Sequence, residues 1–280
     1  MPIERKPEWL QKKANPGEQA VMRRLLDDLN LNTVCQQALC PNISECFGCG
    51  QATFLILGTL CTRLCSFCNI EKQEPLQIDT DEPVRIAVAV ARLELAHVVI
   101  TSPTRDDLPD GGAGIYAEVV TAIRSVSPGT RIEVLIPDMQ GKRASLEAVT
   151  ASHPHIIGHN IETVPRLYHI RSGADYRRSL DVLGTCGELS SGIKTKSGVM
   201  LGMGEREDEL LQVLADLRDV GCDYVSLGQY LAPSRAHYPV QEYILPETFD
   251  ALRSVALGMG FSHVESGPYV RSSYNATAYK

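Results

Sequence analysis

Three cysteines directly follow a short apolar run, and they constrain the chain more than any other feature. Residues 53–57 (TFLIL) have the length and composition of a buried strand and end at a glycine. Cys61, Cys65 and Cys68 follow in the spacing CxxxCxxC, with Phe67 before the last. Because a cubane iron–sulfur cluster normally takes four thiolates, three cysteines this close predict a [4Fe-4S] cluster with one iron open to another ligand.

Zinc and disulfide bonds are the alternative uses for such a group. Zinc would need a fourth Cys or His at a compatible spacing, and disulfides would need an oxidising compartment. The N-terminal residues 1–13 lack the apolar stretch of a signal peptide, and no apolar run approaches the ~18 residues of a membrane span. We therefore expect a cytoplasmic protein with no membrane partner, whose nine cysteines mostly serve metal or redox chemistry. Cys186 and Cys222 stand apart and are expected to be small buried residues.

A second group of cysteines precedes the apolar run. Cys35, Cys40 and Cys46 form CxxxxCxxxxxC, with a proline and an asparagine turning the chain after the second. A second group of three cysteines so close to the first suggests a second metal cluster. The formal charge of −7 argues against a general affinity for nucleic acid.

Strand-like runs alternate with helical patterns over the rest of the chain. Six strands are expected at 53–58, 97–102, 131–136, 155–160, 197–203 and 223–230. Three helices are expected to bury one apolar stripe each: Val21, Leu25 and Leu29 in residues 15–31, which Asn15 caps with Glu18 in the capping box; Val84, Val88, Ala91 and Leu95 before the second strand; and Leu210, Leu214 and Leu217 in residues 205–220.

This alternation predicts an α/β protein with a parallel sheet. Six units can curl into a partial barrel, although a doubly wound open sheet fits the periodicity equally well. A chain of 280 residues without a low-complexity linker can form one structural unit. We divide it into an N-terminal cluster-bearing extension (1–52), a barrel (53–260) and a short C-terminal tail (261–280).

The segment from Cys61 to Cys68 resembles the radical S-adenosylmethionine (SAM) superfamily, in which the amine and carboxylate of SAM chelate the open iron. The chain further resembles the lipoyl synthases. That similarity rests on both cysteine trios, KPEWL at 6–10, CPN at 40–42 and RSSY at 271–274. The superfamily resemblance implies a (β/α)6 form of the TIM-type barrel and thereby favours the barrel over the open sheet.

The family resemblance also implies the ligands of two [4Fe-4S] clusters. Cys61, Cys65 and Cys68 would hold the SAM-binding cluster. An auxiliary cluster would be held by Cys35, Cys40, Cys46 and a serine of RSSY, for which we favour Ser273 over Ser272. Cys49 departs from the family pattern and is expected to be a spectator, because three cysteines at the family spacing are already present.

Polar residues near strand ends are the candidate contacts of SAM. In the HNIET segment of 159–163, the resemblance implies that Asn160 and Glu162 approach the SAM ribose. Thr101 and Ser102 end the second strand. Arg171 and Lys194 either pair with a carboxylate of SAM or substrate or belong to a solvated basic surface. The nearby histidines are expected to be structural, namely His153, His155 and His159.

The resemblance implies a sulfurtransferase that inserts sulfur at C6 and C8 of an octanoyl group on a lysine of a carrier protein. The auxiliary cluster would be consumed as the sulfur donor. Implied partners are an octanoylated lipoyl carrier domain or glycine cleavage H protein, and a ferredoxin or flavodoxin as reductant. The alternatives are a radical SAM enzyme whose second cluster binds substrate, and a non-catalytic iron–sulfur or zinc protein.

Overall fold

The computed structural model describes residues 6–12, 16–49 and 51–279, and its centre is one large sheet. The sheet order is β1-β2-β5-β6-β7-β8-β9-β10, and neighbouring strands are parallel except for β1, which is antiparallel to β2. The strands are β1 (Asn32–Thr33), β2 (Thr53–Leu55), β5 (His97–Thr101), β6 (Arg131–Leu135), β7 (Ile156–Gly158), β8 (Lys194–Leu201), β9 (Tyr224–Gln229) and β10 (His263–Gly267). A separate two-stranded sheet pairs β3 (Leu60–Cys61) with β4 (Glu71–Lys72).

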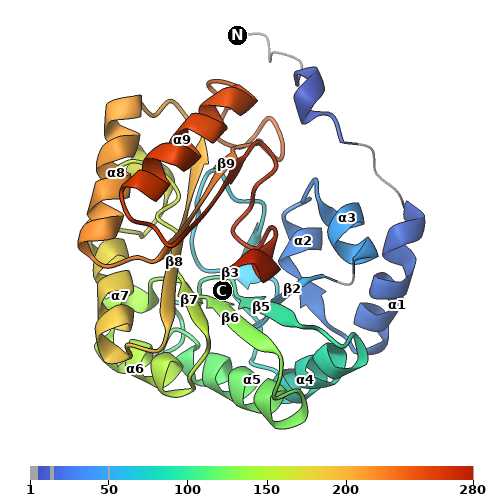
Figure 1. The fold of residues 1–280 in the computed structure, drawn as a ribbon. Coiled ribbons are helices and arrows are strands. Elements are labelled where there is room, and N and C mark those ends of the chain that lie inside the picture. Colours follow the sequence, from blue (N-terminus) through green and yellow to red (C-terminus); the bar gives the residue numbers. More distant parts are fainter. Residues whose placement is uncertain (1–5, 13–15, 50, 280) are drawn as a thin grey trace.

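The strand order decides between the two predicted architectures. From β2 to β10 the strands follow one another in sequence order, whereas a doubly wound sheet reverses its order at a switch point. Figure 1 shows the helices arranged around the outside of the strands. They are α4 (Glu82–Arg92), α5 (Ala113–Val126), α6 (Arg143–Ala151), α7 (Tyr176–Leu189), α8 (Glu207–Asp219) and α9 (Pro246–Gly258). The partial barrel is therefore confirmed, and the open sheet is excluded.

The N-terminal extension packs beside β2. It contains η1 (Glu8–Leu10), η2 (Pro16–Gln19), α1 (Ala20–Asp28), α2 (Val34–Gln37) and α3 (Ile43–Gly48). The predicted helix over 15–31 is thus shorter, and its caps at Asn15 and the Glu18 side chain lie outside the described residues. Because β1 pairs with β2, the extension is hydrogen-bonded directly to the barrel sheet.

Two of the predicted apolar stripes coincide only in part with the buried helix face: Leu25, Leu29 and Leu95 pack on the core, but the first residue of each stripe is exposed. In α1, Val21 is 78% exposed, whereas Met22 and Leu26 are 1% exposed and join the core. In α4, Val84 is 61% exposed, and the sheet is covered by Ile86, Ala87 and Val90. Both helices carry enough aliphatic residues for two faces, so periodicity alone did not identify the most deeply buried residues.

Other predictions about helices and cysteines are confirmed. Leu210, Leu214 and Leu217 of α8 are buried, and Gly221 follows the helix with a left-handed φ of 80°. Cys186 and Cys222 are fully buried. Within the described residues, no helix is both long and apolar enough to cross a membrane.

The C-terminal segment differs from the predicted tail. Residues 263–267 form β10, which pairs in parallel with β9 and extends the sheet beyond residue 260. The chain then turns inward. Figure 1 shows its last turn, η5 (Ala276–Ala278, dark red), in the middle of the ring of strands.

The interior of the barrel contains a buried charge pair. The ammonium of Lys196 donates a hydrogen bond to Glu133 Oε1 at 2.9 Å, and the other carboxylate oxygen lies 3.3 Å from His97 Nε2. The same ammonium lies 3.5 Å from the ring centroid of Tyr279, which is fully buried. The ammonium therefore also makes a cation–π contact with a buried ring of the C-terminal segment.

A second charge cluster ties the cysteine loop to the barrel. Arg63 lies between Cys61 and Cys65, and its guanidinium contacts Asp106 Oδ2 at 2.7 Å and Asp138 Oδ1 at 2.6 Å. Asp138 follows β6 and is itself fully buried. Bidentate contacts of this kind fix the direction of both partners, so the loop is held over the strand ends.

We expect Lys196→Met to lower the free energy of unfolding by about 3–5 kcal/mol, because it leaves the Glu133 carboxylate buried without its cation. The double variant Lys196→Met/Glu133→Leu should recover much of the loss, since no charge is then stranded. Urea denaturation followed by circular dichroism measures both. Equal destabilisation of the single and double variants would contradict this account.

Asp138 makes a pH-dependent contribution to the stability of the fold. Burial alone raises the pKa of Asp138, but hydrogen bonds and charge from Arg63 outweigh it and lower the pKa from 3.8 to about 2. A depressed pKa gives stability that is present above pH 4 and is lost as pH falls through 2, worth about 2 kcal/mol at pH 7. In metal-free protein, Asp138→Asn should be less stable than the unsubstituted chain at pH 7. The gap should shrink by roughly half at pH 3, and a constant gap would refute the assignment.

Candidate iron–sulfur and cofactor sites

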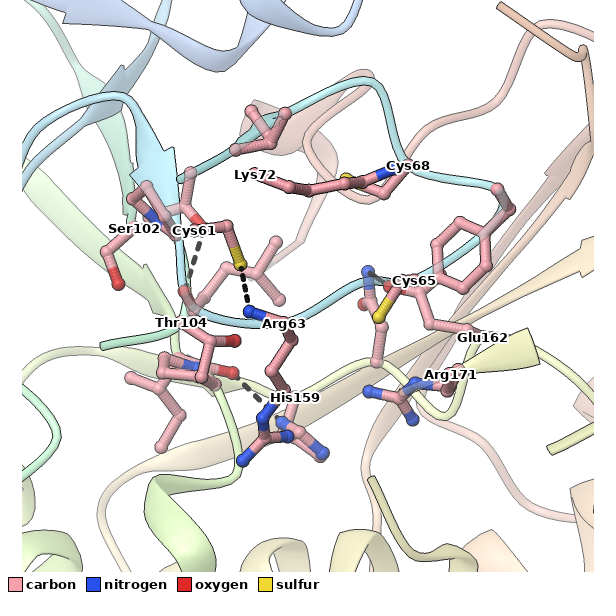
Figure 2. Close-up of a pocket in the computed structure, with 18 residues that line it drawn as sticks. Cys61, Arg63, Cys65, Cys68, Lys72, Ser102, Thr104, His159, Glu162 and Arg171 are labelled. Atoms are coloured by element: carbon pink, nitrogen blue, oxygen red, sulfur yellow. Dashed lines mark hydrogen bonds between the residues drawn. The ribbon is translucent and has the colours of Figure 1, made fainter. Parts of the chain in front are cut away.

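One cavity lies where β5, β6 and β7 end. Figure 2 shows Cys61, Cys65 and Cys68 on the single loop that passes over it, with Arg171 beneath Cys65. The structure therefore brings together most residues predicted around the SAM cluster. Those lining this first cavity are Cys61, Cys65, Cys68, Thr101, Ser102, Asn160, Glu162 and Arg171.

Arg171 brings a cation into the first cavity. Its guanidinium stacks 5.0 Å from the ring centroid of Tyr168 and donates to the Tyr168 hydroxyl and, at 3.2 Å, to the Ile161 carbonyl. None of the described carboxylates forms an ion pair with it. Neutral partners thus orient Arg171 while its charge remains available to an anionic ligand.

Glu162 brings a carboxyl group into the first cavity on a constrained backbone. It has a left-handed backbone, with φ of 65°, fixed by hydrogen bonds from its N–H to Gly198 O and from the Met200 N–H to its carbonyl. Burial raises the pKa of Glu162, and the nearby Arg171 charge and the Asn160 hydrogen bond only partly offset this. A non-glycine residue in this conformation is typical of functional sites.

The first-cavity thiols are partly withdrawn from water. Burial raises the pKa of Cys65, and it raises that of Cys68 to about 11. At neutral pH these metal-free thiols are therefore protonated. Binding iron would release their protons, because thiolates are the ligating form.

His159 also lines the first cavity, as part of its wall. Its Nδ1 lies 2.9 Å from the Ile136 carbonyl and its Nε2 lies 3.1 Å from Ser179 Oγ. Burial lowers the pKa of His159 to about 4, so the ring is neutral at pH 7. Both ring nitrogens have partners, which supports the structural role predicted from sequence.

A second, smaller cavity holds the other cysteine trio. It is lined by Cys35, Cys40 and Cys46 together with Ser273 and Arg271. Burial raises the pKa of Cys35 to about 11 and that of Cys46 to about 12, the latter with a contribution from the neighbouring thiols. Three thiols and one hydroxyl, from segments more than 220 residues apart, thus face a common space.

The two serines of RSSY have different surroundings. Ser273 lines the second cavity, and its Oγ accepts a hydrogen bond from Thr53 Oγ1 at 2.7 Å. Ser272 is outside that lining, and its Oγ accepts from Asn160 Nδ2 at 2.6 Å. This difference supports the choice of Ser273 as the oxygen ligand.

Two of the singled-out residues do not join either cavity. Lys194 begins β8 at the amino end of the sheet, opposite the first cavity, and its ammonium pairs with Asp223 Oδ1 at 2.8 Å. Lys194 therefore does not take the ligand-facing position considered for it. Cys49 is exposed after α3 and outside the lining of the second cavity, in keeping with a spectator.

Sequence reasoning did not identify several residues of these cavities. Lys72 adds a cation to the first cavity, and Thr53, His97 and Arg271 line the second. Thr53 and His97 begin strands, so only inward alternation along those strands could have indicated them. Arg271 is the first residue of RSSY, and that motif was the available signal.

Both donor sets fit iron–sulfur clusters. Each trio of thiols converges on its own cavity, and thiolate is the characteristic ligand of such clusters. Among the residues that the structure describes, no three His, Cys, Asp or Glu side chains converge closely enough for one metal ion. The first cavity also holds the cation and polar groups that an amino-acid ligand requires.

Comparison with solved structures supports the barrel. A crystal structure of methylornithine synthase superposes with a TM-score of 0.57 at 14% identity, over 96% of this chain and 85% of that one. Streptococcus suis SuiB bound to S-adenosylmethionine superposes with a TM-score of 0.61 at 13% identity, over 89% of this chain and 60% of that one. At such low identity these similarities concern the fold alone.

Sequence comparison is far more specific. Residues 55–217 match the model of the radical SAM superfamily. The lipoyl synthase of Geotalea uraniireducens is 67% identical over 279 residues, which are 100% of this chain and 99% of the relative. That of Trichlorobacter lovleyi is 65% identical over the whole of both chains, and that of Caldicellulosiruptor saccharolyticus is 52% identical over 97% and 96%. The chain therefore belongs to the lipoyl synthase family of the radical SAM superfamily.

Proposed function

We propose that this protein inserts two sulfur atoms, at C6 and C8, into an octanoyl chain attached to a lysine of a carrier protein. As a member of its family, it is a sulfurtransferase that uses SAM and [4Fe-4S] clusters. The observation that carries the residue-level proposal is that two separate cysteine trios line adjoining cavities of one barrel.

The two cavities adjoin along β5. Val99 lines the second cavity and Thr101 the first, and these residues lie two apart on the same face of β5. Two residues of a strand span about 6.6 Å. This adjacency is what the proposal requires, because one alkyl chain would have to meet both sites.

The first cavity would bind SAM. Cys61, Cys65 and Cys68 would hold three irons of a cluster and leave the fourth to the amine and carboxylate of SAM. Arg171 would neutralise the carboxylate, and Glu162 and Asn160 would meet the ribose hydroxyls, with Thr101 and Ser102 nearby. Apolar side chains complete the wall and would exclude water from the reacting carbon, namely Phe67, Ile70, Leu135 and Ile136.

The second cavity would hold the auxiliary cluster through Cys35, Cys40, Cys46 and Ser273. When bound, the two clusters and SAM supply the chemistry that the side chains lack, namely radical abstraction of hydrogen from unactivated carbon and a source of sulfide. The serine hydroxyl is a harder ligand than thiolate and holds iron less firmly. Ser273 would thereby make one iron easy to release, as a sacrificial sulfur donor requires.

The substrate is presented by a lipoyl-carrier protein. Within that class we propose an octanoylated lipoyl domain or a glycine cleavage H protein, and a ferredoxin or flavodoxin as electron donor. A protein-bound lysine arm fits a site inside the barrel, because only the arm has to enter.

The direct test is anaerobic reconstitution followed by single turnover. We expect about eight irons per chain, corresponding to two four-iron clusters. With SAM, a strong reductant and an octanoyl-lysyl peptide, mass spectrometry should detect a mono-thiolated and then a dithiolated peptide. Iron should be lost from the Cys35, Cys40 and Cys46 site at the same time.

Two outcomes would overturn the proposal in different ways. SAM cleavage without sulfur transfer, with both clusters intact, would indicate a radical SAM enzyme in which the second cluster binds substrate. Equal turnover of free octanoic acid would contradict the carrier-bound substrate. Absence of SAM cleavage would reject the radical mechanism.

A substitution at residue 273 tests the serine ligand. Ser273→Cys should retain iron in the auxiliary site during turnover and lower sulfur transfer by at least tenfold, because a fourth thiolate binds iron more firmly. SAM cleavage should persist. Ser272→Cys is the matched control, and an effect there with none at Ser273 would reverse the assignment.

A further inference from the structure

Asn160 belongs to the first cavity and holds the residue next to a lining residue of the second. It lines the first cavity, and its amide Nδ2 donates to Glu162 Oε1 at 3.1 Å and to Ser272 Oγ at 2.6 Å. Ser272 immediately precedes Ser273, which lines the second cavity. One side-chain amide thus joins the proposed SAM site to the segment that supplies the serine ligand.

The barrel interior is shaped to allow this contact. A Cβ on Gly198 would lie 2.9 Å from Asn160 Oδ1, and a Cβ on Gly228 would lie 2.1 Å from the Val270 carbonyl. Glycine at these two strand positions therefore leaves space for the Asn160 side chain and for the C-terminal segment. The contact is accommodated by both neighbouring strands.

Ser273 is fixed from two directions. Thr53 donates to its hydroxyl, as described above, and Asn160 holds the preceding residue. Of these two anchors, only Asn160 lines the first cavity. A ligand in the first cavity can therefore reach Ser273 through Asn160 but not through Thr53.

The two N–H groups of the Asn160 amide determine whether a ligand in the first cavity would strengthen or weaken the hydrogen bond to Ser272. An asparagine amide has two N–H donors, and both are engaged by Glu162 and Ser272. A ligand hydroxyl would then donate to Oδ1. Accepting that bond polarises the amide and strengthens the bonds it donates, so the ligand and Ser272 reinforce each other instead of competing.

We propose that Asn160 is a positioning residue that couples the two sites: SAM in the first cavity tightens the hold on Ser272 and thereby keeps Ser273 on the auxiliary iron. Departure of SAM or its cleavage products then loosens that iron. This inference rests on the proposed function, which assigns the cavities to SAM and to the auxiliary cluster. By linkage, an intact serine–iron contact must also raise the affinity for SAM by the same factor.

The test measures iron affinity without turnover. Holoenzyme carrying both clusters is equilibrated anaerobically with increasing chelator, with and without SAM and without reductant. Removal of one ferrous iron from an auxiliary [4Fe-4S]2+ cluster leaves an integer-spin three-iron form, and its appearance is followed by parallel-mode electron paramagnetic resonance. A Cys35→Ala/Cys40→Ala/Cys46→Ala variant supplies the signal of the SAM-binding cluster alone, which is subtracted.

Saturating SAM should raise the chelator concentration needed for half-loss by roughly 3–10-fold, the range that one hydrogen bond can supply. In Ser272→Ala the auxiliary iron should be bound less tightly, and SAM should no longer change the chelator concentration needed for half-loss. Ser272→Thr keeps the hydroxyl and should restore it. In Thr53→Val the auxiliary iron should be bound less tightly at every SAM concentration, but SAM should still raise the chelator concentration needed for half-loss.

The outcomes separate the inference from the proposed function. If the unsubstituted holoenzyme has both clusters but shows no effect of SAM on its auxiliary iron, the coupling is refuted and the proposed function stands. An undiminished SAM effect in Ser272→Ala also refutes it. If reconstitution yields no second cluster on Cys35, Cys40 and Cys46, the proposed function itself fails.

Discussion

The space inside the barrel is the constraint on which both sites depend. Parallel strands bring their carboxyl ends to one rim, where the first cavity lies, but the second cavity is completed by a segment that enters the interior. Gly198 and Gly228 leave the room that this segment and Asn160 occupy. A barrel interior filled by branched side chains, as is usual for the fold, would have no place for them.

Two arginines line the first cavity and differ in their partners. Arg63 is satisfied by two aspartates and fixes the cysteine loop, whereas Arg171 is held by neutral groups and keeps its charge for a ligand. Arg63 therefore has a structural role, whereas Arg171 can bind an anionic ligand. What distinguishes them is the partner set, since an arginine that already has two carboxylates has no net charge to offer an anion.

Local patterns were sufficient for much of the fold and of the site. The cysteine trios, HNIET and RSSY are short motifs, and the cavities contain most residues that these motifs indicated. The misjudged features depend on distant partners. The buried face of α1 depends on the core residues that Met22 and Leu26 meet, which local periodicity does not specify. Lys194, at the amino end of β8, pairs with Asp223 from another part of the chain. Ser272 and Ser273 were separable only through Asn160 and Thr53, more than a hundred residues away in sequence.

The two cavities also differ in how much of the chain must fold before each exists. Cys61, Cys65 and Cys68 lie within eight residues, so their loop can gather early. The second cavity needs contacts between residues 42 and 269, 53 and 273, and 45 and 274. Contacts that close such long loops form late in folding. The complete donor set of the second cavity, Ser273 included, is therefore assembled only once residues 269–274 have packed against the N-terminal extension and β2.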